Sequence, residues 1–206
     1  MTQLSGHDTV PRISGQVCPM LAVDIAESTR ADRDVEIQRR LRTSLYGILR
    51  EALDGCGMPW NSQCKYEDRG DGLAVIFPPD LAAQPIVDSF PDLLGSLIRS
   101  HNRGSGDAAR MQLRMAAHIG PAYSDEHGFF GCHVTHLCRM LDAQALRRAL
   151  AESGAEFALI VSDYLYDNLV LQRRSLVGQK SFRQVRTHVK RTPVRGWIYL
   201  PEASRP

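Results

Sequence analysis

The sequence lacks the features of a membrane or secreted protein. No apolar run in its 206 residues approaches the ~20 residues of a bilayer span, and residues 1–7 show neither the basic nor the apolar region of a signal peptide. The five cysteines form no Cys-x-x-Cys pair, and their odd number argues against a disulfide framework. We therefore expect a cytoplasmic protein with reduced, mostly buried thiols and no membrane partner.

Other absences narrow the chemistry. The Gly-Asp-Gly turn at 70–72 is followed by no Gly-Lys-Ser/Thr, so it is not a phosphate loop. His133-x-x-His136 has helical spacing but no Cys or carboxylate companions, which argues against zinc. His118 is expected to be a hydrogen-bonded structural histidine.

The stretch 172–195 carries eight Lys or Arg and no acid. It has too few aromatic residues to stack nucleic-acid bases, so we expect no nucleic-acid partner. Two interpretations stay open for its charges: solvated strand faces, or a surface that faces phosphate.

The composition indicates one globular domain. The chain is 43% hydrophobic and 23% charged, with a net charge of +2, which is ordinary for a folded protein and demands no acidic partner. Residues 1–15 are polar and show no periodicity, so we expect a flexible lead-in followed by a single domain over 16–201.

Hydrophobic periodicity predicts strands and helices in alternation. The run 17–25 reads as a strand buried on both faces, and residues 28–32 offer caps for the helix after it. The further elements are expected in this order: a helix over 35–53, hairpin strands over 64–69 and 73–77, a helix over 86–98, a strand over 111–119, a loop or irregular hairpin over 120–128, a helix over 134–150, a strand over 157–161, a helical turn over 163–169, and strands over 182–190 and 194–200.

This order predicts an α+β fold, a ferredoxin-like βαββαβ core with a C-terminal αβ extension and one sheet covered by helices on one face.

Two carboxylates are expected to meet at one edge of this sheet. Asp24 ends the first strand, and Asp71 lies in the hairpin turn. Hard oxygen ligands placed together suit Mg²⁺ or Mn²⁺, which keep waters and substrate phosphates as further ligands. Taken singly, Asp24 could instead cap the following turn and Asp71 could serve only as a turn former.

Five segments resemble, in the same order, motifs of the class III adenylyl and guanylyl cyclase catalytic domain. Val23-Asp-Ile-Ala-Glu-Ser-Thr29 is similar to its Asp-Ile-x-x-Phe/Ser-Thr strand end, and Glu67-Asp-Arg-Gly-Asp71 to its Lys/Glu-x-x-Gly-Asp hairpin. Arg114-Met-Ala-Ala-His-Ile-Gly120 resembles the Arg-x-Gly-x-His-x-Gly strand. Gly131-x-x-Val-Thr-x-x-x-Arg139 resembles Gly-x-x-Val-Asn-x-Ala-x-Arg, and Val189-Lys-Arg-Thr-Pro-Val194 resembles the Leu/Val-Lys-Gly segment.

The resemblance implies a head-to-tail homodimer with two composite sites. Asp24, Asp71 and the Ile25 carbonyl of one subunit would hold two Mg²⁺ or Mn²⁺ ions. From the other subunit, Arg139 would stabilise charge on the α-phosphate, and Lys190 would bind the β- and γ-phosphates. The implied reaction converts a nucleoside triphosphate into the 3′,5′-cyclic nucleotide and pyrophosphate.

The resemblance also bears on the base. Glu67 stands where adenylyl cyclases carry Lys and guanylyl cyclases carry Glu, and a carboxylate accepts from the N1–H and amino group of guanine. The second base-reading position falls near Gly128, which has no side chain. GTP is therefore favoured, and pyrimidine nucleotides stay open.

Thr135 stands where the family carries Asn, and Ala116 replaces a glycine of the strand motif. Because a threonine hydroxyl is shorter and has one donor, an alternative function follows. It is a weakened or inactive cyclase-like domain that serves as a nucleotide-binding or dimerisation module in bacterial signalling or phage defence.

Overall fold

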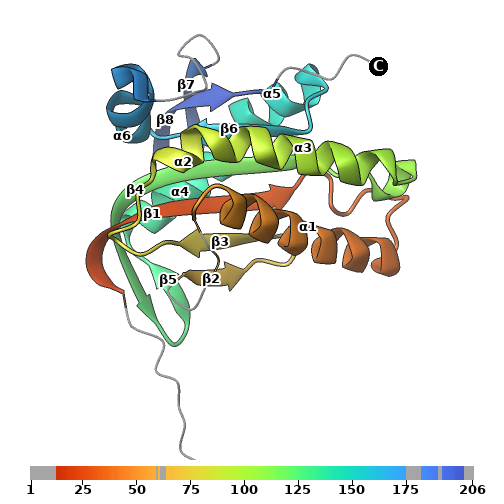
Figure 1. Cartoon of the computed structure of the whole chain (residues 1–206), viewed down its shortest axis with the longest axis horizontal. Coiled ribbons are helices and arrows are strands. Elements are labelled where there is room, and N and C mark those ends of the chain that lie inside the picture. The colour runs from red at the N-terminus through yellow and green to blue at the C-terminus, as the bar shows by residue number, and fades with distance from the viewer. Residues whose placement is uncertain (1–12, 59, 61–63, 175–181, 190–191, 202–206) are drawn as a thin grey trace, which may run out of the picture.

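The computed structural model describes residues 13–58, 60, 64–174, 182–189 and 192–201. Strands alternate with helices along the chain (Figure 1). The strands are β1 Ser14–Ile25, β2 Lys65–Asp68, β3 Gly72–Ile76, β4 Leu113–Asp125, β5 Gly128–Phe130, β6 Phe157–Val161, β7 Phe182–Val189 and β8 Thr192–Tyr199. The helices are α1 Val35–Gly55, α2 Gln84–Val87, α3 Ser89–Arg103, α4 Cys132–Leu141, α5 Gln144–Ser153 and α6 Asp163–Leu165, with a 3₁₀ turn η1 Asp107–Ala109 and a π-helical segment η2 Tyr166–Arg174.

The strands form one mixed sheet. Its order is β2-β3-β1-β4-β6-β8-β7, with β5 paired to β4 outside this path. The segment β2-β3-β1-β4 is antiparallel throughout, and it is the sheet of a ferredoxin-like βαββαβ unit. Strand β6 adds parallel to β4, and the β7–β8 hairpin completes the sheet. The α+β fold with a C-terminal extension is confirmed.

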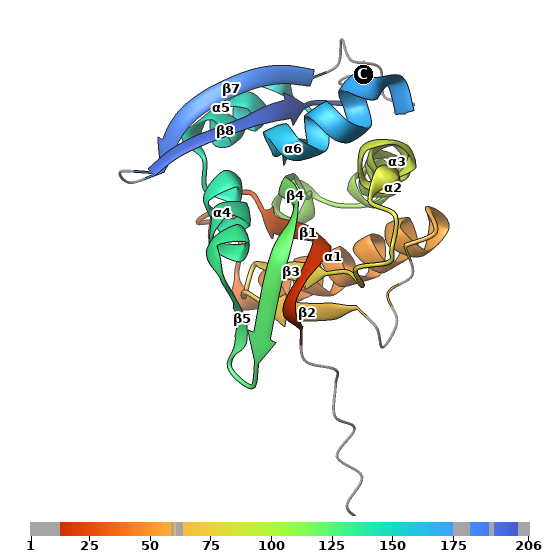
Figure 2. The same ribbon diagram turned by 90° about the vertical axis from the view of Figure 1, so that its left-hand side faces the viewer.

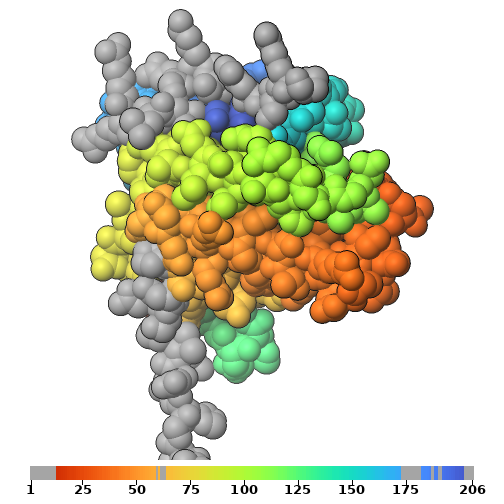
Figure 3. Space-filling model, turned by 45° about the vertical axis from the view of Figure 1, so that its right-hand side comes forward, coloured from red at the N-terminus to blue at the C-terminus, as the bar shows by residue number. Residues whose placement is uncertain are grey.

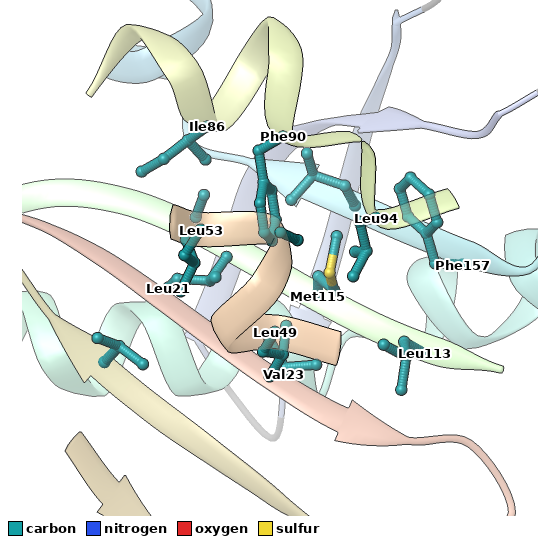
Figure 4. Close-up of a cluster of buried hydrophobic side chains, with 14 of the residues drawn as sticks. Leu21, Val23, Leu49, Leu53, Ile86, Phe90, Leu94, Leu113, Met115 and Phe157 are labelled. Carbon is teal, nitrogen blue, oxygen red and sulfur yellow. The ribbon is translucent and has the colours of Figure 1, made fainter. Parts of the chain in front are cut away.

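Helices cover both faces of the sheet, not one as expected. Leu21 and Val23 of β1 pack in a core with α1, α3 and α2, which Figure 4 shows in close-up. The alternate residues Met20 and Ala22 pack in a second core with α4 and α5. Figure 1 shows α1 and α3 in front of the sheet and α4 behind it, and Figure 3 shows the surfaces of α1 and α3 side by side. A strand that is apolar on both faces needs both faces covered, so the continuous run 17–25 already carried this information.

The first helix begins later than the expected caps. The carboxylate of Asp34 accepts from the Ile37 N–H at 2.8 Å, so Asp34 is the N-cap. Residues 28–32 instead belong to a connection held by the guanidinium of Arg33. That side chain is 6% exposed and donates to the backbone carbonyls of Ala26, Glu27, Ala108 and Arg110.

Two further boundaries differ from the expectation. The helix expected over 134–150 is two helices, because Ala143 has extended backbone angles between α4 and α5. Ser14 and Gly15, which the lead-in was expected to include, begin β1, since Ser14 pairs with Tyr123 of the long strand β4. Residues 1–12 of that lead-in lie outside the described residues. None of the helices within the described ranges has the length and apolarity to cross a membrane.

Candidate active site at the end of strands β1 and β3

Asp24 and Asp71 lie at the same end of the sheet. Asp24 is paired in register with Gly72, the residue after Asp71. The Ile25 N–H donates to the Asp71 carbonyl at 3.0 Å, which ties the hairpin turn to the end of β1. A Cβ at Gly72 would lie 2.1 Å from the Val23 carbonyl oxygen, so only glycine permits this approach. The expected meeting of the two acidic positions is thus present in the fold.

Asp24 and Asp71 both form side-chain interactions beyond the turn-capping and turn-forming roles that the sequence left open. Asp24 does not cap the following turn, because both its oxygens accept from the guanidinium of Arg114, each at 2.8 Å. The carboxylate of Asp71 accepts from the Ser28 hydroxyl at 2.6 Å, so it does more than form a turn. The hairpin turn and the connection after β1 are therefore joined through side chains as well as backbone.

The Asp24 carboxylate is mostly buried and has Arg114 as its cationic partner. Its side chain is 14% exposed, and burial raises its pKa to about 6. Arg114 opposes this rise, whereas the carboxylates of Asp71 and Asp142 add to it. A cation beside Asp24 and Asp71 would offset both the burial and the mutual repulsion. The donor set fits a divalent ion such as Mg²⁺ or Mn²⁺, since two carboxylates and the Ile25 carbonyl supply hard oxygens and substrate phosphates supply others.

Within the described ranges, no group of three or more His, Cys, Asp or Glu side chains is arranged to hold a metal. A site built on two carboxylates therefore depends on oxygens from the backbone, water or a bound substrate, as magnesium sites commonly do.

Glu67 and Gly128 come together within one chain. The Glu67 carboxylate accepts from Arg69 at 2.7 Å and from the Phe129 N–H at 3.2 Å. A Cβ at Gly128 would lie 1.9 Å from Glu67 Oε1, and the residue has a φ of +127°. Glycine at this position thus leaves room for the carboxylate, and the two expected base-reading positions share one place on the surface.

Thr135 and Arg139 lie on α4. Buried Val134 and Leu137 hold this helix on the sheet, Thr135 is exposed, and Arg139 is half-buried in the last turn. The Thr135 hydroxyl donates to the Gly131 carbonyl at 3.0 Å, within its own helix. Lys190 lies outside the described residues.

The helix α4 lies beside the β2–β3 hairpin. Burial raises the pKa of the Cys138 thiol on this helix, while the charges of Arg69, Asp142 and Glu67 also act on it. Within the described part of the chain, no hydrogen bond or ion pair joins Thr135 or Arg139 to Asp24 or Asp71.

Arg114 and Ser28 are partners that the sequence did not assign. Arg114 is part of a motif, yet its role follows only from register, because β4 runs antiparallel to β1 and places Arg114 opposite Asp24. Residues directly opposite on neighbouring strands point to the same face. An acid and a base at such positions would have been the signal, once the register was known.

Comparison with known proteins finds matches among solved structures but none among family models or curated sequences. No protein-family model matches the sequence, and no curated protein sequence matches it. A solved structure of an adenylate/guanylate cyclase/hydrolase from Silicibacter pomeroyi matches with 21% identity and a TM-score of 0.64, over 92% of this chain and 99% of that one. The guanylyl cyclase Cya2 matches with 13% identity and a TM-score of 0.59, over 92% and 93%. The chain has the class III nucleotide cyclase fold.

Another protein with the cyclase fold is the adenylyl cyclase CyaB from P. aeruginosa, at 15% identity and a TM-score of 0.58 over 93% of this chain and 96% of that one. The similar structures include both adenylyl and guanylyl cyclases at low identity. The likeness therefore establishes the cyclase fold, and the substrate has to be inferred from the side chains of the site.

Proposed function

We propose that this protein is a metal-dependent nucleotide cyclase, which converts a nucleoside triphosphate, with GTP favoured, into the 3′,5′-cyclic nucleotide and pyrophosphate. The observation that carries the proposal is the placement of Asp24 and Asp71 at one end of the sheet, where the hairpin turn is hydrogen-bonded to the end of β1. The cyclase fold supports the same reaction class.

Asp24, Asp71 and the Ile25 carbonyl would hold two Mg²⁺ or Mn²⁺ ions. When bound, such ions lower the pKa of the ribose 3′-hydroxyl and neutralise the triphosphate. The chain's own residues prepare this site. Ser28 orients the Asp71 carboxylate, and Arg114 holds the Asp24 carboxylate in a bidentate pair.

The second half of the site would come from a partner copy. Within the described residues, neither Arg139 nor Thr135 forms a hydrogen bond or ion pair with the two aspartates of its own chain, which favours a homodimer with composite sites. The Arg139 guanidinium suits the α-phosphate because its fork matches phosphate oxygens. Lys190 would bind the β- and γ-phosphates.

Glu67 supports guanine as the base. Each carboxylate oxygen accepts one hydrogen bond from Arg69 or the Phe129 N–H and keeps a second lone pair. That capacity suits the N1–H and amino group of guanine, whereas the N1 of adenine is an acceptor. Gly128 keeps the surface beside Glu67 open.

Product analysis tests the proposal. The full chain is incubated with each of the four nucleoside triphosphates and Mn²⁺, and cyclic products are quantified by mass spectrometry. We expect cyclic GMP as the main product and a loss on the order of 100-fold or more in Asp71→Asn. Asp92→Asn changes an exposed aspartate on α3 and is the matched control. Absence of any cyclic product from all four nucleotides would contradict the proposal.

A second candidate rests on Thr135. Its hydroxyl hydrogen is engaged by the Gly131 carbonyl, so it does not point as a donor toward a ribose. The alternative is a weakened or inactive cyclase-like domain that binds nucleotide and dimerises. It predicts metal-dependent nucleotide binding without turnover, and a gain of rate in Thr135→Asn.

Thr43→Asn is the matched control for this alternative, because Thr43 on α1 makes the same hydroxyl bond to the carbonyl four residues earlier. Turnover by the unmodified chain that disappears in Asp71→Asn would exclude the second candidate.

A further inference from the structure

The connection between β1 and α1 continues directly from the candidate metal site. Ile25 ends β1, and the Ser28 hydroxyl in this connection donates to the Asp71 carboxylate at 2.6 Å. Figure 2 shows α1 and α3 on one side of β1 and β4, and α4 on the other. The backbone of residues 25–28 therefore determines where the Ile25 carbonyl and the hydroxyl that orients Asp71 lie.

Glu27 in this connection has a strained backbone. Its φ is +53°, and it is the one non-glycine residue with a positive φ among those that the structure describes. A β carbon makes this left-handed conformation costly. The residue is exposed, so burial of its side chain does not hold the backbone in place. Strain of this kind persists only where the surrounding structure imposes it.

Arg33 supplies the constraint on this strained residue. It is 6% exposed, and its Nη1 donates to the carbonyls of Ala26 and Glu27 at 3.2 and 3.0 Å. Its Nε and Nη2 donate to the carbonyls of Ala108 and Arg110 at 3.1 and 2.7 Å. The guanidinium thus fastens the backbone of residues 26 and 27 to a segment 75 and 77 positions further along the chain from Arg33.

The Arg33 guanidinium is buried without an anionic partner. Within the described part of the chain it forms no hydrogen bond or ion pair with a carboxylate, those of Asp24 and Asp71 included. Burial lowers its pKa, which reflects the cost of removing the charge from water. The four carbonyl bonds offset this cost, and a rigid fork of donors is what allows one side chain to reach both segments.

We propose that Arg33 is a positioning residue for the metal site. It holds Glu27 in the left-handed conformation and thereby places the Ile25 carbonyl and the Ser28 hydroxyl beside Asp71. This inference rests on the proposed function, since it assigns Arg33 a role toward the metal ligands named there. Arg33 acts through the backbone of the connection and not by contact with the metal or the nucleotide.

Metal binding is measured without turnover, by equilibrium dialysis of Mn²⁺ with 3′-deoxy-GTP and 3′-deoxy-ATP as separate probes, because both lack the attacking hydroxyl. We expect Arg33→Met to weaken Mn²⁺ binding by about tenfold, since the strained backbone relaxes. Arg33→Lys should weaken it to a similar extent, because one ammonium cannot span both segments.

Arg30→Met is the matched control for the arginine variants. Arg30 lies in the same connection and donates to the Asp107 carbonyl, but its side chain is 39% exposed. It makes no hydrogen bond to the carbonyls of residues 26 and 27 within the described ranges. Its substitution should leave Mn²⁺ binding within about twofold of the unmodified chain.

Substitution of Glu27 separates the positioning role from a general loss of stability. In Arg33→Met, the additional change Glu27→Gly should restore most of the Mn²⁺ affinity, because glycine adopts a positive φ without strain. Glu27→Ala removes the same carboxylate but keeps the β carbon, so it should not restore the affinity. Recovery with glycine no larger than with alanine, or unchanged Mn²⁺ binding in the Arg33 variants, overturns the proposal.

A measurement on the unmodified chain covers the case in which the Arg33 variants fail to fold. The backbone ¹³C chemical shifts of Glu27 report its φ in the protein without metal. Values of the left-handed region are expected, and values of extended or right-handed helical backbone overturn the proposal.

The outcomes are distinguishable from those of the cyclase proposal. Mn²⁺ binding with the expected dependence on Arg33 and Glu27, but without any cyclic product from the four nucleoside triphosphates, rejects catalysis and supports the positioning role. Cyclic product together with unchanged Mn²⁺ binding in Arg33→Met rejects the positioning role alone. No Mn²⁺ binding by the unmodified chain overturns both.

Discussion

The two ends of the α4-covered face hold buried ionisable groups in opposite ways. Arg114, Ala116 and His118 alternate along β4 and face the same side of the sheet, so the ends lie about 13 Å apart along the strand. At the acidic end, Arg114 forms an ion pair with Asp24. At the histidine end, His118 Nε2 forms a hydrogen bond with His133 Nδ1. Strand β4 thus places Arg114 and His118 on the same face of the sheet. The neighbouring side chains determine whether an ion pair forms, as with Asp24, or a hydrogen bond between rings, as with His133.

The two ends therefore respond to pH in opposite directions. Burial raises the pKa of Asp24 to about 6, above its unfolded value, so its ionisation costs stability as pH rises through that range. Burial lowers the pKa of His118 to about 3, below its unfolded value. Its contribution is fully present above the ordinary histidine pKa and is lost as pH falls toward 3.

Gly72→Ala should break the acidic end most severely. The new Cβ would meet the Val23 carbonyl at 2.1 Å and the Asp24 Cα at 2.8 Å, and neither backbone atom can move without separating β1 from β3. We expect a loss of about 3 kcal/mol or more in the free energy of unfolding, measured by chemical denaturation.

Gly120→Ala is the matched substitution at the histidine end. Its Cβ would meet Nδ1 of the His133 side chain at 2.2 Å, and a side chain can rotate away. The loss should be smaller, about 1 kcal/mol. Equal losses of stability in the two variants would contradict this difference, because they would mean that the backbone around Gly72 can shift as readily as the His133 side chain.

His118→Gln should reduce the dependence of the free energy of unfolding on pH below pH 7. Between pH 7 and pH 5 the unfolded chain gains a proton on His118 that the folded chain does not, which costs about 2 kcal/mol of unfolding free energy. Denaturation across this pH range should show that much less dependence in the variant. His127→Gln removes an exposed histidine and should retain the dependence of the unmodified protein. An unchanged slope in His118→Gln would mean that His118 protonates in the folded state.

Arg114→Met should make the acidic end more sensitive to pH. Without the guanidinium, the pKa of Asp24 rises further, so the variant loses more stability at pH 8, where the carboxylate is ionised, than at pH 5. We expect a difference of about 1 to 2 kcal/mol between the two pH values, each determined from urea denaturation.

Arg42→Met is the control for a surface pair, since Arg42 and Asp68 are each 40% exposed. Its effect should stay below about 1 kcal/mol and vary little between pH 5 and pH 8. A pH response as large as that of Arg114→Met would remove the distinction between the buried pair and the exposed one.

The sequence predicted the acidic end well. The strand, the hairpin and the Gly-Asp-Gly turn are local patterns, and their combination placed Asp24 and Asp71 together, as the structure confirms. The partners of these acids were not predictable in the same way. Arg114 lies 90 positions from Asp24 along the chain, and only the β1–β4 register brings them face to face.

The histidine end was predicted in part. His118 was expected to be a hydrogen-bonded structural histidine, and it is buried with its Nε2 2.8 Å from His133 Nδ1. Nothing in the sequence indicated that its Nδ1 would lack a partner among the described residues. The motif spacing of His133 and His136 indicates one helix face and says nothing of the strand beneath it. The rings of His133 and His136 contact His118 because α4 packs on β4. This packing depends on two features: α4 ends before Ala143, and a second core covers this face of the sheet.

By itself, the sequence determined the order of strands and helices and the pairing of Asp24 with the Gly-Asp-Gly turn, because both follow from periodicity and turn chemistry within short segments. The tertiary structure alone decided that helices cover both faces, that Arg114 neutralises Asp24, and that His118 keeps an unsatisfied nitrogen. These features join residues distant in the chain, and their energies depend on burial and register, which no local pattern encodes.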